Sequence, residues 1–174
     1  VMAFGGAVWN VLVLCGMHLT YYMAGVEIFI QSGSDPLMMP TVVAGTIGIF
    51  GMTTGALLKS LKNKEKRSAF TGYWLTHLIS GVTEPALFGI GMRYTRPFIG
   101  ACLGGAVCAI YYAITGVAVT TMAAASNFLI FTQFMGGSSA NLVNGIIGGA
   151  IGFAVAAAYT YFFGFKKEDL KEDK

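Results

Sequence analysis

The chain alternates between long apolar stretches and short polar breaks. Residues 36–58, residues 98 to about 124 and residues 142–163 are each long enough to cross a bilayer, which takes about 20 apolar residues. Residues 1–14 are also apolar, but they are too short to cross comfortably unless they end a longer helix. No Asp, Glu, Lys or Arg occurs between Pro97 and Phe165. The pattern predicts an all-α polytopic membrane protein.

Residues 15–36 are too polar for a lipid-facing helix and too apolar for a solvated loop. They include His18, Tyr21, Glu27 and Asp35. Backbone that leaves regular structure at membrane depth is tolerated where it is buried in protein or lines a cavity. We therefore expect re-entrant or cavity-lining backbone here.

A second break, GVTEP at residues 81–85, interrupts the apolar residues 68–92. The Glu84 carboxylate is costly inside a membrane, and Pro85 cannot donate a backbone hydrogen bond to a helix. A segment that contains both of these unfavourable residues is more typical of a substrate pathway than of a helix that serves only in packing.

Composition supports the membrane assignment. Of 174 residues, 55% are hydrophobic and 11% are charged, with a mean hydropathy of +0.67; soluble domains average about 25% charged residues. Small-residue ladders predict closely packed helices; their glycine pairs are Gly51/Gly55, Gly100/Gly104, Gly145/Gly149 and Gly148/Gly152. Cys15, Cys102 and Cys108 form no CxxC pair, so we expect inert thiols and no metal, redox or cofactor site.

Charge predicts the orientation. Residues 59–67 (KSLKNKEKR) carry five basic residues and one acid, so the positive-inside rule makes this loop cytoplasmic. The loop either is solvated and binds no ligand, or forms a binding site for a lipid headgroup or a phosphate. The net charge is +3, but outside the predicted membrane segments no stretch of the sequence combines basic residues with interleaved aromatic residues. We therefore expect no nucleic-acid partner.

The number of crossings constrains the segment around Glu84. If the basic loop and residues 166–174, a charged tail, are both cytoplasmic, an even number of crossings separates them. The predicted spans from residues 98 and 142 supply two. Residues 68–92 must then dip in and return, with the turn near Thr83-Glu84-Pro85, which keeps Arg93 and Arg96 on the cytoplasmic side. The sequence therefore predicts a re-entrant hairpin.

The chemistry of Glu84 has three readings. It is a protonated structural acid, a proton-coupling carboxylate of a secondary transporter, or a ligand for a substrate hydroxyl. His18 and His77 are the remaining candidates, and lone histidines in apolar surroundings more often belong to the core. His77 and Glu84 would share a face if the helix were continuous. With no third ligand at suitable spacing, we expect no metal site.

The runs GVTEPALFG (81–89) and RYTRPF (93–98) resemble the membrane (IIC) component of sugar phosphotransferase permeases, in the glucose/glucoside superfamily. Gly16-Met17-His18 resembles the family's G-L-H element, and Asp35-Pro36-Leu37 resembles its Y-D-P-L turn. The chain departs from the glucoside branch at Leu19, where a Trp usually follows the His. The resemblance extends over nearly the whole chain.

The resemblance implies the C-terminal, substrate-binding half of a IIC transporter, with two re-entrant hairpins around the sugar. It implies that Glu84 and His18 contact the sugar hydroxyl that is phosphorylated. Thr83 and Gly81 belong to the same hairpin tip. The position of Arg93 beside the hairpin, apart from the resemblance, predicts either an anchor at the membrane interface or guidance of an anionic donor or product phosphate. The donor would be a phosphocysteine on a separate IIB domain, supplied by IIA and the general phosphotransferase proteins, and none of the three cysteines fits that role.

These expectations give one membrane domain, residues 1–165, in a multi-pass protein of the bacterial cytoplasmic membrane that contacts lipid. The full-length form is expected to be a homodimer that transports a glucoside or disaccharide. The chain opens inside an apolar segment without a signal peptide, so we treat it as a fragment lacking N-terminal helices. The alternatives are a proton-coupled sugar transporter with Glu84 as coupling carboxylate and a purely structural bundle.

Overall fold

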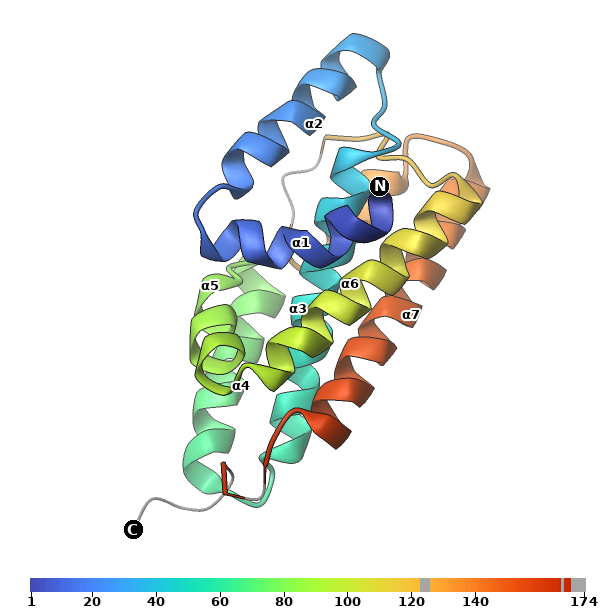
Figure 1. The fold of residues 1–174 in the computed structure, drawn as a ribbon. Helices are drawn as coiled ribbons and strands as arrows, with labels where there is room; N and C mark the ends of the chain where they lie inside the picture. Colours follow the sequence, from blue (N-terminus) through green and yellow to red (C-terminus); the bar gives the residue numbers. More distant parts are fainter. Residues whose placement is uncertain (123–125, 167, 170–174) are drawn as a thin grey trace.

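The computed structural model describes residues 1–122, 126–166 and 168–169, and most of these residues are helical (Figure 1). An isolated bridge between Asp35 and Val119 is their only β-pairing. The elements in chain order are α1 (Met2–Leu14), α2 (His18–Ser32), α3 (Met38–Lys59), α4 (Lys64–Ser80), α5 (Glu84–Ala86), the π-helical η1 (Leu87–Met92), α6 (Arg96–Thr115), the 3₁₀-helical η2 (Ile130–Phe134) and α7 (Ser139–Phe163). The all-α prediction is confirmed.

Three helices, α3, α6 and α7, are long and apolar enough to cross a membrane. They run side by side, and α3 lies at the centre, since 78% of its most apolar stretch is buried against 28% for α7 (Figure 1). The predicted spans at residues 36–58 and 142–163 are confirmed. The span predicted from residue 98 to about 124 was too long, because Gly116 takes a left-handed conformation (φ 66°) and ends α6 at Thr115.

The helices touch through glycines, as the small-residue ladders predict. A Cβ on Gly104 of α6 would lie 2.6 Å from the carbonyl oxygen of Gly152 of α7, and a Cβ on Gly51 of α3 would lie 2.5 Å from that of Phe153. Gly6 of α1 and Gly105 of α6 meet in the same way. Without side chains between them, the backbones approach closely enough for extensive van der Waals contact.

The segment around Glu84 forms a hairpin. Gly81 (φ 73°) ends α4, and its N–H donates to the carbonyl of His77 at 3.0 Å. The returning η1 packs against α4, because a Cβ on Gly89 would lie 2.5 Å from the Tyr73 ring, and the rings of Phe70 and Tyr94 lie 6.3 Å apart. Residues equally distant from the turn are therefore neighbours, which confirms the predicted chain reversal.

The end of α4 also separates His77 from Glu84, which a continuous helix would have placed on one face. His77 is buried within α4, whereas Glu84 begins α5 and is exposed. The condition for a common face, a continuous helix, is not met, because α4 ends at Ser80.

The described residues between α6 and α7, 117–122 and 126–138, form a second reversal that reaches the first. The N–H of Thr120 donates to the carbonyl of Gln133 at 2.9 Å, and the side chain of Asn141 hydrogen-bonds both N–H and C=O of Ala118 at the base. At the far end, the amide of Asn127 donates to the carbonyl of Ile79 at 3.1 Å. The two reversals match the two hairpins that the resemblance implies, while their depth in the bilayer stays a prediction.

Residues 15–36 are more regular than expected. They form a turn at Gly16 (φ 72°), the 15-residue helix α2 and a left-handed end at Gly33 (φ 73°). The expectation was re-entrant or cavity-lining backbone, and the cavity-lining alternative agrees with the positions of Leu19 and Tyr22. His18, at its start, does line a cavity.

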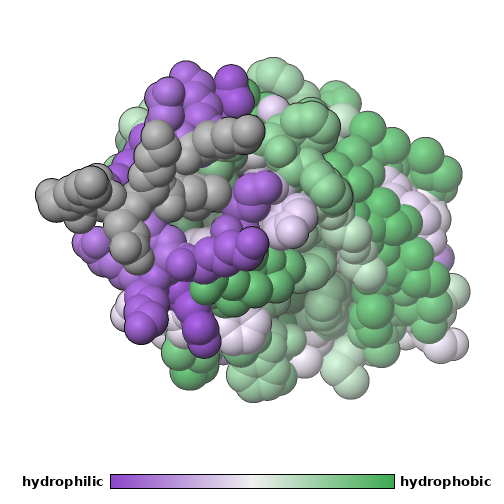
Figure 2. Space-filling model, turned by 90° about the horizontal axis from the view of Figure 1, so that it is seen from below, coloured by the Kyte–Doolittle hydropathy of each residue, from purple (hydrophilic) through white to green (hydrophobic). Residues whose placement is uncertain are grey.

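The basic segments gather at one end of the molecule. Lys66 Nζ, in the first turn of α4, donates to the carbonyl of Asp169 at 2.5 Å, and the ring of Tyr94 lies 5.0 Å from that of Phe165. Seen from this end, a hydrophilic area adjoins a broad hydrophobic surface (Figure 2). This arrangement agrees with the crossing count: α6 and α7 lead away and back, and the hairpin returns to the end from which it started.

Candidate functional site

The site is organised around the start of α3, which Asp35 holds in place. Its buried carboxylate accepts hydrogen bonds from the N–H groups of Leu37 (2.7 Å), Met38 (2.9 Å) and Met39 (2.7 Å). Its backbone pairs with Val119 at the base of the second hairpin. Asp35 thereby ties together the end of the α2 segment, the central helix and the second hairpin.

A cavity of about 310 Å³ lies between the α1–α2 corner, α3 and the second hairpin. Its walls combine aromatic, aliphatic and hydrogen-bonding side chains; they are Trp9, His18, Leu19, Tyr22, Val42, Val43, Thr46, Ser126, Ile130 and Gln133. We call it the polar cavity. The His18 ring meets Trp9 edge-on at 6.1 Å, and its buried Nδ1 has no hydrogen-bond partner.

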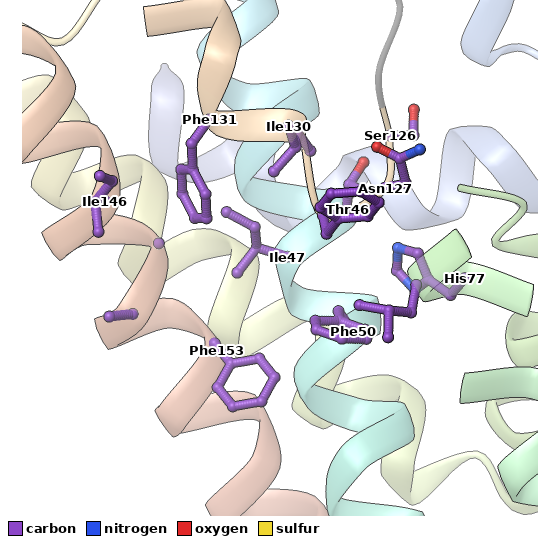
Figure 3. A pocket seen from close by; sticks show the side chains of 14 residues that line it. Thr46, Ile47, Phe50, His77, Ser126, Asn127, Ile130, Phe131, Ile146 and Phe153 are labelled. Atoms are coloured by element: carbon purple, nitrogen blue, oxygen red, sulfur yellow. The ribbon is translucent and has the colours of Figure 1, made fainter. Parts of the chain in front are cut away.

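A second cavity, of about 290 Å³, lies on the other side of residues 126–130 (Figure 3). Its walls are mainly phenylalanine and aliphatic side chains from α3, α7 and the second hairpin, with His77 of α4 at one side; they are Thr46, Ile47, Phe50, His77, Leu78, Ser126, Asn127, Phe128, Ile130, Phe131, Ile146, Gly149, Ala150 and Phe153. We call it the apolar cavity. The two cavities share Thr46, Ser126 and Ile130.

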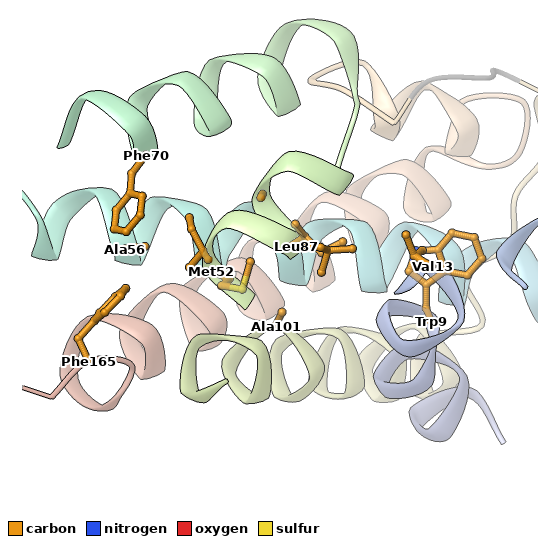
Figure 4. Close-up of a cluster of buried hydrophobic side chains, with 11 residues drawn as sticks. Trp9, Val13, Met52, Ala56, Phe70, Leu87, Ala101 and Phe165 are labelled. Atoms are coloured by element: carbon orange, nitrogen blue, oxygen red, sulfur yellow. The ribbon is translucent and has the colours of Figure 1, made fainter. Parts of the chain in front are cut away.

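The tip of the first hairpin lies close to both the α1–α2 corner and the second hairpin. Leu87, three residues after Glu84, belongs to the same buried cluster as Trp9 and Val13 of α1 (Figure 4). A Cβ on Gly81 would lie 3.0 Å from the backbone nitrogen of Asn127. In Figure 1 the start of α5, which carries Glu84, lies beside the α1–α2 corner, which carries His18.

Within that region, the predicted residues differ in their surroundings. Glu84 is exposed and Thr83 is half-buried; neither is among the side chains that line the two cavities. No contact between Glu84 and His18 is found among the described residues. Their joint action on one ligand stays a prediction.

Arg93 lies apart from the hairpin tip. It is exposed at the basic end, with its guanidinium carbon 5.6 Å from the centre of the Tyr94 ring. The geometry suits an interfacial anchor or a contact to an anion approaching from that side, and it separates Arg93 from His18.

Of the aromatic residues considered for stacking on a sugar, Tyr22 lines the polar cavity. Tyr21 instead hydrogen-bonds Thr41 at 2.7 Å, Tyr94 packs in an aromatic cluster, and Phe88 is exposed. The described residues contain no group of three metal-ligating side chains.

Sequence reasoning did not single out Thr46, Ser126 or Gln133 as cavity residues. Thr46 resembles any threonine of a spanning helix, and its hydroxyl donates to the carbonyl of Val42 at 2.9 Å. Ser126 and Asn127 form a polar pair inside an apolar stretch, which is the signal that would have identified the second hairpin tip.

Comparison with known proteins identifies the family. The chain is 34% identical over 168 residues to a beta-glucoside-specific EIIBCA component of the PTS system from Dickeya chrysanthemi, covering 94% of this chain and 26% of that protein. It is 31% identical to the corresponding Bacillus subtilis component, covering 95% of this chain and 26% of the relative. The sucrose-specific EIIBC component of Bacillus subtilis is 30% identical, covering 99% of this chain and 36% of the relative. The chain belongs to the EIIC-type membrane components of the PTS.

The resemblance carried by the GVTEP run is thereby confirmed. This EIIC-type chain spans about a quarter of the length of the beta-glucoside relatives that it matches. No family model and no solved structure matches it.

Proposed function

We propose that this EIIC-type chain binds a glucoside or related disaccharide in the polar cavity during uptake across the bacterial cytoplasmic membrane. It presents one sugar hydroxyl for phosphorylation. The sugar-specific PTS relatives support the coupling of transport to phosphorylation, and their specificities for beta-glucosides and sucrose support a glucoside-type substrate.

The observation that carries the proposal is the approach of the Glu84 hairpin tip to the corner where His18 enters the polar cavity. Transfer of a phosphoryl group to a hydroxyl needs that hydroxyl fixed in line with the donor and its proton accepted. In the proposed roles, His18 hydrogen-bonds the sugar, and Glu84 accepts the proton or fixes the hydroxyl. Thr83 and Gly81 shape the turn that presents the carboxylate.

The proposal needs a phosphoryl donor outside this chain. Cys102 and Cys108 lie within α6, a candidate spanning helix, and Cys15 lies at the α1–α2 corner. We propose a phosphorylated IIB domain as donor, with IIA and the general PTS proteins upstream. It would approach the basic end that includes Arg93. Residues 1–165 would be part of a membrane domain surrounded by lipid, the full-length protein a homodimer, and residues 166–174 a cytoplasmic tail.

The test compares carboxylate variants in the full-length protein reconstituted with its phosphorylated donor. Glu84→Gln keeps the shape and removes the base, and we expect sugar phosphorylation to fall by about 100-fold or more. The matched control is Glu27→Gln, an exposed carboxylate on α2 whose partner is Gln31, and it should retain wild-type rates.

Two results would contradict the proposal. Full activity in Glu84→Gln would return Glu84 to a structural role. Sugar uptake that continues without any phosphoryl donor and collapses with the proton gradient would instead support the proton-coupled transporter.

A further inference from the structure

We propose that Phe165, just beyond the end of α7, is a positioning residue for Glu84, a role that rests on the proposed function of that carboxylate. Phe165 lies at the base of the first hairpin, whereas Glu84 lies at its tip. Its effect on phosphorylation is therefore indirect and acts through the arms of the hairpin.

Phe165 packs against both arms at the base. The centre of its ring lies 6.0 Å from that of Phe70 on α4 and 5.0 Å from that of Tyr94, which follows η1 on the returning arm. The rings of Phe70 and Tyr94 lie 6.3 Å apart, so the three rings contact one another pairwise. Phe165 and Phe70 are both buried. Aromatic pairs at these separations stabilise each other beyond the area they bury, so Phe165 joins the two arms to the end of α7.

The segment that carries Phe165 is itself fixed to the hairpin. The N–H of Lys166 donates to the carboxylate of Asp169 at 2.7 Å, and the N–H of Asp169 donates to the carbonyl of Lys166 at 3.1 Å. Lys66, in the first turn of α4, donates to the backbone carbonyl of Asp169. The turn that follows Phe165 is thus bound to the same helix that carries Phe70.

The joint between the returning arm and α6 needs such support. Thr95 has φ 55° and ψ −48°, and the described residues contain no other non-glycine residue with positive φ. A β-branched residue is strained in this region, and a strained conformation persists only where surrounding contacts hold it. Tyr94, immediately before the joint, is held by Phe165 and Phe70. Without Phe165, relief of the strain at Thr95 would rotate the returning arm.

One buried cluster connects this base with the tip. Its side chains extend from Phe165 and Phe70 at one end, past Leu87, to Trp9 at the other (Figure 4). Leu87 lies three residues after Glu84 on the returning arm. Displacement of the arm at its base therefore changes the packing of the segment that presents the carboxylate.

A small rotation at the base is enough to displace Glu84. The returning arm from Tyr94 back to Glu84 is about 15 Å long at the rise of an α-helix, so a rotation of about 4° moves the carboxylate by about 1 Å. Misplacement of a reacting group by about 1 Å can lower a rate by about 100-fold. The contact between Gly89 and Tyr73 limits this rotation, so we expect a loss of about tenfold.

The first test measures the position of the tip. Val82→Cys and Met17→Cys, both at exposed positions, are labelled with nitroxides in full-length protein that lacks the native cysteines, and pulsed electron paramagnetic resonance gives the distance between the labels. We expect Phe165→Ala to broaden the distance distribution and to shift its centre by about 1 Å or more. The control, Phe162→Ala, removes an exposed ring at the end of α7 and should leave the distribution unchanged.

The second test measures sugar phosphorylation by the full-length protein with its phosphorylated donor. We expect Phe165→Ala to lower kcat about tenfold and to change KM less than about twofold, because the polar cavity is left intact. Phe165→Tyr keeps the ring and should restore kcat, and Phe162→Ala should match the wild type. If Phe165→Ala does not fold, Phe165→Leu takes its place in both tests, with a fall in kcat of about threefold.

The two tests separate the positioning role from the proposed function. An unchanged distance distribution in Phe165→Ala, or in Phe165→Leu in its place, would overturn the role of Phe165 whatever the rate. A displaced tip with an unchanged kcat would instead show that phosphorylation does not depend on the position of Glu84, and would overturn the proposed function on which the inference rests.

Discussion

The ring of Tyr73 on α4 lies directly against the backbone of Gly89 on the returning arm of the first hairpin. A Cβ on Gly89 would stand 2.5 Å from two carbons of that ring. This contact fixes how closely the two arms approach, and with it the position of the turn that carries Glu84.

Gly89→Ala should therefore open the hairpin. The added methyl group cannot be accommodated without displacing Tyr73, so we expect a loss of about 1–3 kcal/mol in stability. Thermal unfolding in detergent measures it. The control is Gly72→Ala on α4, next to Tyr73, where a Cβ meets nothing within 4 Å. Equal destabilisation by both variants would show that the Tyr73 contact is unimportant.

Asp35→Ala should destabilise the start of α3. The carboxylate accepts three backbone hydrogen bonds, and loss of a cap of this kind costs about 1–2 kcal/mol. We expect a lower unfolding temperature and faster proteolysis between α2 and α3. Glu27→Ala, which removes an exposed carboxylate, should change neither, and an unaffected Asp35→Ala would argue against the capping role.

If residues 68–92 form a re-entrant hairpin, the membrane face from which single cysteines are labelled can be predicted. The cysteines are introduced into a variant that lacks Cys15, Cys102 and Cys108. Leu61→Cys and Arg93→Cys, both at exposed positions of the basic end, should react with an impermeant maleimide from the cytoplasmic face. Ser139→Cys, at the start of α7, should react from the opposite face. If Arg93→Cys reacted from the same face as Ser139→Cys, the segment around Glu84 would cross the membrane.

Asn127→Ala should loosen the contact between the two hairpin tips. The lost hydrogen bond to Ile79 leaves a carbonyl at the end of α4 without its partner, at a cost of about 1 kcal/mol. Hydrogen exchange should quicken at residues 77–81 and stay unchanged in α6. Uniform quickening in both regions would indicate global rather than local destabilisation.

Much of the fold follows from the sequence because lipid restricts what a backbone can do. Apolar length located α3 and α7, and the charge count required the Glu84 segment to turn back. The end of α6 at Gly116 was missed, because apolar residues continue through the second hairpin and hydropathy does not distinguish helix from buried irregular backbone.

The candidate site was predictable only in part. GVTEP and the Gly16–His18 element identified Glu84 and His18 from their resemblance to a family. The cavities depend instead on Ser126 and Thr46, whose roles arise from contacts between segments 80 residues apart in the chain. Periodicity contains no information about such contacts.

The glycine contacts among α1, α3, α6 and α7 have a consequence for transport. Where backbones touch without intervening side chains, a helix cannot slide along its neighbour unless it first separates from it, so these four helices should move as one block. Among the described residues, the hairpin tips are joined by the side-chain hydrogen bonds of Asn127 with Ile79 and of His77 with the backbone of Ser126, and by a backbone contact from Phe128 to Leu78. Exposure of a bound sugar to one side and then the other would thus come from displacement of the hairpins or of the whole block, with the helix crossings unchanged throughout the cycle.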